Sequence, residues 1–324
     1  MENAANIPVP PNLTNLFWRP IDQNNLEAII DLSLRCYAVD GGFEEMYEPD
    51  SIKILYLPDE PCSGICAYTT DGHIAACASV SINGDSGNQR ARIVGQVRPD
   101  QRRRGIGNFL MQWSQEKAKV LLAGAPQSQK VMEVETGSLT EPAHRLYQAH
   151  GFSCVHEELV MERDLHLALP ERPLPQGVTI LNWQPNLAEQ FFQAWYASFR
   201  DRPGFPGYNS VEWIAQVTEN DHKPEWSLLA RVNDEPVGFT IGNINQTKDS
   251  PCGEIWKIGV IPTQRRRGLA SALLVETMRQ MQEAGASSAN LTVNINNPGA
   301  IQAYSLLSFI IIGRYARYEQ IIET

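Results

Sequence analysis

The order of apolar and polar residues along the chain predicts strands that alternate with helices. Short apolar runs at Leu16–Arg19 and at Val178–Asn182 predict two opening strands. Each run is followed by a stretch in which apolar residues recur at helical spacing, Asn25–Tyr37 in the first case and Leu187–Phe199 in the second. Strands interleaved with helices in this way indicate the α/β class, a mixed sheet with helices packed on it.

The later elements of this pattern also occur twice. Extended runs flank turn residues in Tyr68–Ala75 and in Arg231–Gly238, so each segment is expected to form a β-hairpin. A third strand follows each hairpin, and a glycine loop then opens a long helix. We expect these helices at Ile106–Leu122 and Leu269–Glu283, buried strands at Val131–Glu135 and Ala289–Asn294, and a short helix and a last strand at the end of each half.

The two halves repeat at a nearly constant offset. Gly105 and Gly268 close the same Gln-Arg-Arg-Arg-Gly run and lie 163 positions apart, whereas Tyr147 and Tyr304 lie 157 apart. Several matches at nearly one offset indicate a duplication. Three prolines within Leu167–Gly177 indicate a stiff linker. We therefore expect a first domain over residues 1–166, a linker over 167–177 and a second domain over 178–324.

Composition limits the classes of protein that fit this pattern. The 324 residues, 43% of them hydrophobic and 20% charged, are enough for two cores of ordinary size. A net charge of −10 argues against general nucleic-acid binding and would suit a cationic acceptor. The chain opens without a basic or apolar leader, and no stretch approaches about 18 uninterrupted apolar residues. We therefore expect a cytoplasmic protein with no membrane segment.

The six cysteines do not have the spacing of a metal site. Cys62 and Cys66 form a lone Cys-x3-Cys pair, with no second pair and no histidine cluster nearby. We therefore expect free thiols in a reducing compartment and no bound metal.

The repeated Gln-Arg-Arg-Arg-Gly segment has the features of an anion site between a strand and a helix. Glycine lets the backbone turn tightly beside a ligand, and the first turn of a helix leaves N–H groups unpaired at its positive end. Arginines add charge-assisted donors to phosphate. A pyrophosphate or another polyphosphate is expected, although ATP and NAD are poor candidates because the Walker A and Rossmann glycine spacings are missing.

Two motifs resemble those of the GNAT acetyltransferase superfamily. Arg265-x-x-Gly268-x-Ala270 and Arg102-x-x-Gly105-x-Gly107 match its R/Q-x-x-G-x-G/A signature. The segment Asn297–Phe309 is similar to its N-x-x-A-x-x-x-Y-x-x-x-G-F segment. The resemblance implies two tandem GNAT domains, each a mixed, mostly antiparallel sheet flanked by helices, similar to two-domain acetyltransferases of the mycothiol synthase type.

The same resemblance implies acetyl-CoA as cosubstrate. Backbone groups of Ile258 and Val260 would bind its pantetheine arm, and residues 265 to 271 would surround its pyrophosphate. The residues placed at the cofactor in this way are Ile258, Gly259, Val260, Arg265, Arg266, Arg267, Gly268, Leu269, Ala270, Ser271 and Asn297 in the second half, and Val97, Arg102, Arg103, Arg104, Gly105, Ile106, Gly107 and Asn108 in the first.

Acetyl transfer to an amine requires a base for the amine and an acid for the departing thiolate. The resemblance places the acid at Tyr304, and a phenol suits protonation of a thiolate of comparable pKa. Period-2 alternation would put Glu254, Trp256, Ile258 and Val260 on one face of a strand, with Glu254 towards the acceptor. We predict Glu254 as general base and Tyr304 as general acid. The structural alternatives are an ion-paired or solvated glutamate and a core tyrosine with its hydroxyl at the rim.

The first half differs at the positions that would carry this chemistry. The offset of 163 aligns Glu254 with Ala91, and the offset of 157 aligns Asn297 with Thr140, although the arginine-glycine loop is kept. In the second half Ser308 stands where the family has glycine at a helix end. We therefore expect the first half to hold acetyl-CoA structurally and the second half to turn over.

The acceptor is expected at the loop after the first helix of the second half, Arg200–Tyr208. Asp201, Tyr208 and Trp213 would hold a small polar amine, and a loop packed on the body of the protein explains them equally well. We expect a small-molecule amine acceptor, no nucleic-acid or membrane partner, and a monomer that is an internal pseudo-dimer. Two alternatives stay open, a non-catalytic acyl-CoA-binding regulatory protein and an N-acetyltransferase of proteins or peptides.

Overall fold

The computed structural model describes residues 13–42, 44–58, 61–84, 89–124, 130–202, 205, 207–218, 224–245 and 251–322. The chain divides into two compact units. The first is Met1–Val160 together with Ile312–Thr324, and the second is Met161–Ile311. The C-terminal segment therefore packs with the first half, whereas the repeat in the sequence assigns it to the second. Each unit is described by itself.

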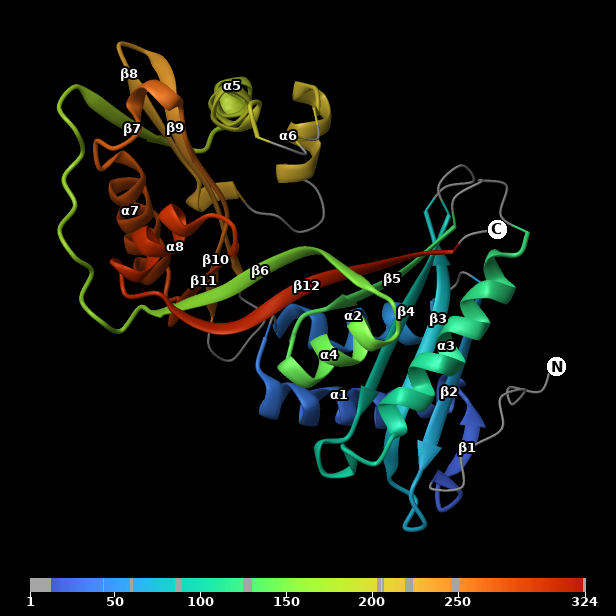
Figure 1. The fold of residues 1–324 in the computed structure, drawn as a ribbon. Coiled ribbons are helices and arrows are strands. Elements are labelled where there is room, and N and C mark those ends of the chain that lie inside the picture. The colour runs from blue at the N-terminus through green and yellow to red at the C-terminus, as the bar shows by residue number, and fades with distance from the viewer. Residues whose placement is uncertain are drawn as a thin grey trace. The chain divides into compact units, whose positions relative to one another are not determined.

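The first unit is a mixed sheet with helices on both faces (Figure 1). Strands β1 to β5 and β12 lie in the order β1-β2-β3-β4-β5-β12. The pairing of β4 with β5 is parallel, and the pairings of β1 with β2, β2 with β3, β3 with β4 and β5 with β12 are antiparallel. The bounds of its elements are β1 Phe17–Pro20, α1 Leu26–Asp40, α2 Pro49–Tyr56, β2 Cys62–Tyr68, β3 Ile74–Asn83, β4 Arg90–Val97, α3 Ile106–Leu122, β5 Lys130–Thr136, α4 Glu141–Ala149, β6 Ser153–Asp164 and β12 Ile310–Ile322, the last two crossing the division between the units.

Helices cover both faces of this sheet because each has one apolar stripe. In α3 the buried residues Ile106, Phe109, Leu110 and Trp113 recur at helical spacing and pack on one face. Helices α1 and α2 form a second apolar cluster on the other face, around Ile29.

The last strand, β12, is part of the first unit's core. Its segment Ala316–Ile322 pairs antiparallel with β5. Ala316 and Tyr318 are both fully buried in the cluster under α3. The end of the chain is therefore needed to complete the sheet of the first unit.

The second unit repeats this architecture. Its strands lie in the order β11-β10-β9-β8-β7, with β10 and β11 parallel and the others antiparallel. Aromatic side chains of α5 and α6 pack on one face, and Leu269 and Leu273 of α7 pack on the other. The bounds are β7 Val178–Asn182, α5 Ala188–Phe199, α6 Ser210–Thr218, β8 Leu228–Val232, β9 Glu235–Asn245, β10 Cys252–Val260, α7 Leu269–Glu283, β11 Ser288–Asn294 and α8 Pro298–Ser305.

The structure confirms most elements expected from the sequence. Helices α3 and α7 have the predicted bounds, and the β8–β9 hairpin turns at Asn233 and Asp234, with φ of 49° and 68° as in a type I′ turn. Helices α2 and α6 were not expected from the sequence pattern. The chain belongs to the fold class that the pattern and the resemblance predict, two mixed, mostly antiparallel sheets with helices on them.

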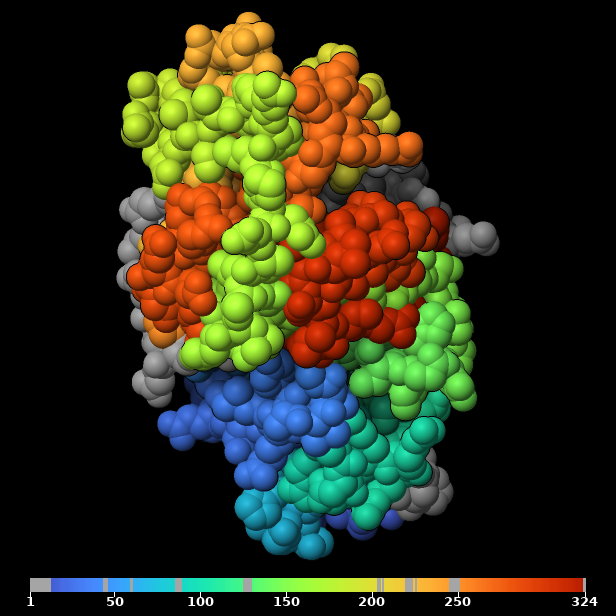
Figure 2. Space-filling view, turned by 90° about the vertical axis from the view of Figure 1, so that its left-hand side faces the viewer, coloured from blue at the N-terminus to red at the C-terminus, as the bar shows by residue number. Residues whose placement is uncertain are grey.

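The proline-rich segment 167–177 forms no helix or strand. Figure 2 shows it, in yellow-green, on the surface of the second unit. Among the described residues, no helix is long and apolar enough to cross a membrane.

Candidate active site

The two arginine-glycine loops have the same backbone conformation. Arg103 and Arg266 have φ of 65° and 59°, and Gly105 and Gly268 precede α3 and α7 with φ of 85° and 81°. Left-handed residues within such a loop turn successive N–H groups to one side and form a concave anion site. No side chain caps either helix, so the first-turn N–H groups are available to an anion. The loop of each unit therefore has a backbone conformation that suits a phosphate.

The first arginine of each loop is a structural clamp. Nε of Arg102 and of Arg265 donates to the carbonyl at the end of the preceding strand, at 3.1 and 3.0 Å. The remaining guanidinium nitrogens of Arg102 form a bidentate ion pair with Asp40 at 2.7 Å, whereas Nη2 of Arg265 donates to the Ser198 carbonyl at 2.9 Å. These contacts tie each loop to the end of the unit's first long helix, α1 or α5.

The other two arginines of each loop differ, because one donates a hydrogen bond to a nearby glutamine and the other does not. Arg104 and Arg267 each donate to the glutamine three positions earlier. Arg103 and Arg266 are exposed and have no hydrogen bond or ion pair to another residue in the described ranges. The sequence assigned all three arginines to the phosphate, and the geometry leaves the middle one as the charged donor to a ligand.

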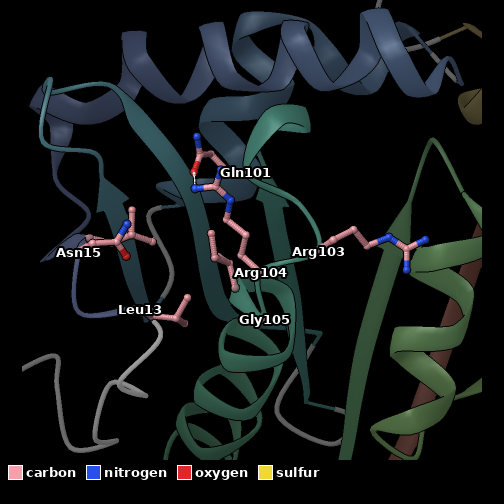
Figure 3. Close-up of a pocket in the computed structure, with 8 residues that line it drawn as sticks. Leu13, Asn15, Gln101, Arg103, Arg104 and Gly105 are labelled. Atoms are coloured by element: carbon pink, nitrogen blue, oxygen red, sulfur yellow. Dashed lines mark hydrogen bonds between the residues drawn. The ribbon is translucent and has the colours of Figure 1, made fainter.

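A cavity of about 480 Å³ lies beside the loop of the first unit (Figure 3). Arg104 is turned back to Gln101, and Arg103 points away from that pair. Arg103 also lines a larger cavity of the same unit. The residues around the smaller cavity are Leu13, Asn15, Leu16, Gln101, Arg103, Arg104, Gly105 and Ile106.

The larger cavity of the first unit has a volume of about 600 Å³. It is lined by β4 from Ile93 to Val97 and by β5 and its loop from Val134 to Ser138. The parallel ladder of these strands ends at the pair Ile93–Val134, so the cavity lies where they part. Oε1 of Gln96, in its wall, is buried without a hydrogen-bond partner in the described part of the chain. The cavity therefore offers an acceptor to a ligand that carries N–H groups.

Strand β10 contains a β-bulge where the sequence pattern predicts regular alternation. Its register against β9 shifts between Ile255 and Lys257, so one residue is extra. An extra residue reverses the face to which the later side chains point. The prediction that Glu254 shares a face with Ile258 and Val260 is therefore wrong.

Glu254 instead lies on the face of the sheet that α5 covers. Its partner on β9 is Asn243. Phe239 lies on the same face of β9, and its ring packs against Phe199 of α5. Gly259 lies on this face too, and a Cβ there would come within 3.0 Å of both rings. The glycine is thus required by aromatic packing.

The bulge also changes which residue of the first unit corresponds to Glu254. In the parallel ladders Glu254 pairs with Asn290, and Arg92 pairs with Glu133. Asn290 and Glu133 are 157 positions apart, which is the offset of the closing helices. The counterpart of Glu254 is therefore Arg92 and not Ala91, so a cation replaces the carboxylate.

Tyr304 is buried in α8, with 8% of its surface exposed. Burial raises the pKa of its phenol to about 12, opposed by the positive charge of Arg202. The Arg202 guanidinium lies 4.2 Å from the ring centre of Phe199, and burial and the charge of Arg265 lower its pKa. Tyr304 is therefore a protonated phenol with a cation nearby. Sequence reasoning named the loop of Arg202 but not this residue.

The ends of α8 are built like those of α4. Asn297 and Thr140 accept a hydrogen bond from the backbone N–H three residues later, both at 3.3 Å. Ser308 and Gly151 both have a left-handed backbone, with φ of 63° and 82°. The two substitutions that the sequence comparison singled out therefore leave the local geometry unchanged.

A buried arginine fixes the end of α8. Arg163, 2% exposed, donates to the carbonyls of Leu307 and Ala168. Leu307 follows Tyr304 by three residues, so the contact holds the turn beside the phenol. Nothing in the sequence pattern marked this arginine, because its partners are backbone carbonyls.

Known proteins match both units of the chain. The model of the acetyltransferase (GNAT) family matches residues 186–309, and that of an acetyltransferase (GNAT) domain matches residues 61–154. Together they span more than half of the chain. The chain belongs to the GNAT acetyltransferase family. It is thus an acyltransferase enzyme built from two tandem GNAT domains.

Curated relatives and solved structures both match over most of the chain. The mycothiol acetyltransferase of Actinosynnema mirum is 27% identical over 304 residues, which cover 92% of this chain and 96% of the relative. That of Thermomonospora curvata is 28% identical over 251 residues, 76% and 77% of the two chains. The GCN5-related N-acetyltransferase from Sphaerobacter thermophilus has a TM-score of 0.73 at 26% identity, over 98% of each chain. A tandem GNAT protein from the clavulanic acid biosynthesis pathway shares the fold, with a TM-score of 0.62 at 15% identity over 94% and 98%.

GNAT acetyltransferases use acetyl-CoA, and the residues present fit it. The uncapped starts of α3 and α7 suit a pyrophosphate, and the loops add Arg103 and Arg266. The buried Oε1 of Gln96 suits an amide N–H of the pantetheine arm. Among the described residues, no three His, Cys, Asp or Glu side chains are grouped to hold a metal ion.

The three residues assigned to the acceptor differ in exposure within the second GNAT domain. Trp213 is fully buried, and its ring lies 5.6 Å from that of Trp195. Tyr208 stacks on Trp195 at 6.3 Å. Asp201 is exposed, 3.9 Å from Arg200. Trp213 is thus a core residue, and Pro203, Gly204 and Pro206 of this loop lie outside the described residues.

Proposed function

We propose that the second unit transfers the acetyl group of acetyl-CoA to a primary amine of a small molecule. Glu254 is the general base and Tyr304 is the general acid in this proposal. The observation that carries it is the pairing, in one unit, of a phosphate loop with a glutamate at the end of the β10–β11 ladder and a buried, protonated phenol.

The chemistry follows from these two groups. Glu254 accepts a proton from the acceptor's ammonium, directly or through one water, and the free amine attacks the thioester carbonyl. The carbon–sulfur bond then breaks, and Tyr304 gives its proton to the departing thiolate. A phenol whose pKa is about 12 keeps its proton at neutral pH, and the positive charge of Arg202 stabilises the phenolate that forms. The products are an amide and the free thiol of CoA.

The cofactor assignments belong to the same proposal. Arg266 and the N–H groups at the start of α7 bind the pyrophosphate, and backbone groups of Ile258 and Val260 bind the arm. Arg103 and the start of α3 do the same for a second acetyl-CoA in the first unit. We also propose that the protein is a monomer located in the cytosol.

The acceptor is proposed from the relatives and from charge. Two relatives that are 28% and 27% identical to this chain are named mycothiol acetyltransferase, and mycothiol is a small molecule. The net charge of −10 favours a cationic amine. We therefore propose a small primary amine as acceptor.

Thiol release from acetyl-CoA with a panel of small amines and short peptides tests the proposal. Glu254→Gln and Tyr304→Phe should each lower turnover about 10²- to 10⁴-fold, with acetyl-CoA binding retained. Glu283→Gln at the exposed end of α7 and Tyr196→Phe on the surface of α5 are matched controls that should keep full turnover. Full turnover in both test variants would show that the catalytic assignment is wrong. Binding without turnover would favour a regulatory protein, and turnover with peptides alone would favour a peptide acetyltransferase.

A further inference from the structure

The larger cavity of the first unit contains a carboxylate and a phenol that the proposed function does not use. Glu135 of β5 and Tyr147 of α4 both line it. The same cavity is lined by Arg103 and by the first residues of α3, to which the proposed function assigns the pyrophosphate of acetyl-CoA. One continuous space therefore joins a candidate base and a candidate acid to an anion site.

Glu135 stands at the point where β4 and β5 part. The last pair of their ladder is Ile93 with Val134, and Glu135 is the next residue on β5. Val134 packs under α3, so Glu135 faces the opposite side, which α1 and α2 cover. Glu254 ends the corresponding ladder on the face that α5 covers. Each unit thus has a glutamate at its branch point, on the corresponding face, but from a different strand.

Glu135 is held by the C-terminal strand. Tyr315 of β12 donates its hydroxyl to Oε1 of Glu135, and burial together with this carboxylate raises the pKa of Tyr315 above its ordinary value. Within the described ranges, Glu135 has no ion pair with a lysine or arginine. Arg317 lies opposite Glu135 in the β5–β12 ladder, although no ion pair joins these two described residues. Because the Tyr315 hydroxyl occupies one oxygen of Glu135, the second oxygen remains to accept a proton.

The other acidic groups of the cavity are engaged. Asp40 forms the bidentate ion pair with Arg102, and the Tyr47 hydroxyl is 2.5 Å from that of Ser138. Of the two carboxylates that line the cavity, Glu135 is the one that forms no ion pair in the described part of the chain.

Tyr147 shares with Tyr304 a phenol whose pKa is raised by burial, although its charged neighbour is Asp40 and not an arginine. Burial raises the pKa of its phenol to about 12. Its ring packs against Tyr318 of β12, with the ring centres 4.9 Å apart. The C-terminal strand therefore contacts both groups, the base through Tyr315 and the acid through Tyr318.

We propose that the first unit is a second acyl-transfer site, with Glu135 as base and Tyr147 as acid. Glu135 takes a proton from the acceptor amine, the amine nitrogen bonds to the carbonyl carbon of an acetyl-CoA held at the α3 loop, and the carbon–sulfur bond breaks. Tyr147 protonates the thiolate, so the products are an amide and CoA. This site goes beyond the proposed function, which places turnover in the second unit, and does not rest on it.

The part of the cavity wall that comes from α2 and the turn before it indicates the acceptor class. Met46, Tyr47, Leu55 and Tyr56 form it, from the turn Glu44–Tyr47 and from α2. These side chains are aromatic or aliphatic, so the acceptor is a primary amine with an apolar body.

The test uses the full chain in which the second unit is silenced by Glu254→Gln and Tyr304→Phe. Thiol release from acetyl-CoA is measured with tyramine, phenethylamine and hexylamine, and with glucosamine and spermidine as polar amines. We expect turnover with the first group, reduced at least about a hundredfold when Glu135→Gln or Tyr147→Phe is added. Calorimetry with acetyl-CoA and thermal melting should show that each added change leaves binding and folding intact.

A matched control is Glu116→Gln, on the exposed side of α3, which should leave this turnover unchanged. Absence of turnover with every amine, or turnover that survives Glu135→Gln and Tyr147→Phe, would overturn the second site. Turnover only with the polar amines would overturn the acceptor class. The reciprocal variant, Glu135→Gln with Tyr147→Phe in an otherwise unchanged chain, reports on the second unit alone, so failure of one proposal is distinguishable from failure of the other.

Discussion

The arginine-glycine loops of the two units differ in φ by only a few degrees. The strands that lead into them differ more, because β10 contains one residue more than β4 in its ladder with the neighbouring strand. The φ angles of Arg103 and Arg266 are 65° and 59°, but β10 has a bulge at a place where the ladder of β4 with β3 is regular. The bulge puts Glu254 at a branch point where the first unit has Arg92. One inserted residue therefore changes which residue of β10 corresponds to Arg92, whereas the conformation of the loop stays the same.

The comparison also shows that the first unit depends on the far end of the chain. Tyr315 and Tyr318 of β12 contact the two groups that we propose as its base and acid. In the second unit, the end of α8 is fixed from within the unit by Arg163. The two units therefore share the same sheet and helices, but the residues proposed for their sites are supported by different contacts.

The largest expected effect is a loss of stability in the first unit, caused by a change in β12. Tyr318 is fully buried in the first unit's core, so Tyr318→Ala should lower the free energy of unfolding of that unit by about 3–5 kcal/mol. Hydrogen exchange should show the loss in β5 and α3 and not in α7. Ile321→Ala, at an exposed position of the same strand, should change stability by less than about 0.5 kcal/mol. Equal loss of protection in both units would contradict the assignment of β12 to the first.

An intermediate effect is expected at alkaline pH. The pKa values of Tyr147 and Tyr304 are both raised to about 12 by burial, above the value of about 10 in an unfolded chain. The folded state keeps these protons longer, so the stability they contribute is present below pH 10 and is lost as the pH rises towards 12. Tyr304→Phe should flatten the loss for the second unit and Tyr147→Phe for the first, measured by thermal unfolding between pH 9 and 12.

A change at Arg202 should distinguish the pKa of Tyr304 from that of Tyr147. Its charge lowers the pKa of Tyr304, so Arg202→Met should move the phenolate absorbance change of Tyr304 to higher pH and leave that of Tyr147 in place. A shift of both tyrosines, or of neither, would show that the charge of Arg202 does not act on Tyr304.

The smallest expected effect concerns the helix ends. Ser308 has φ of 63°, a conformation that costs a non-glycine residue about 1 kcal/mol, so Ser308→Gly should raise the melting temperature of the second unit slightly. Gly151→Ser should lower that of the first unit by a similar amount, because the added Cβ would also approach the end of the Gln320 side chain at 2.7 Å. Opposite signs in calorimetry would support the equivalence of the two caps, and equal signs would contradict it.

The sequence by itself determined what depends on local spacing. The repeat, the bounds of α3 and α7, the hairpins and the arginine-glycine loops follow from apolar periodicity and from glycine, which acts within a few residues. The family followed from motifs of the same kind. The strand that contains Glu254 was also predicted, but not the face of the sheet on which Glu254 lies.

Only the tertiary structure decided the features that depend on residues far apart in the chain. The bulge in β10 is defined by its register against β9, and the different roles of the three loop arginines are set by carbonyls and by Asp40. The pairing of β12 with β5 brings Tyr315 to Glu135 across 180 positions. Such contacts leave no periodic pattern, because each depends on strand pairing and packing rather than on neighbouring residues. The sequence therefore located the two arginine-glycine loops, and the fold determined the face of the sheet on which each candidate carboxylate lies.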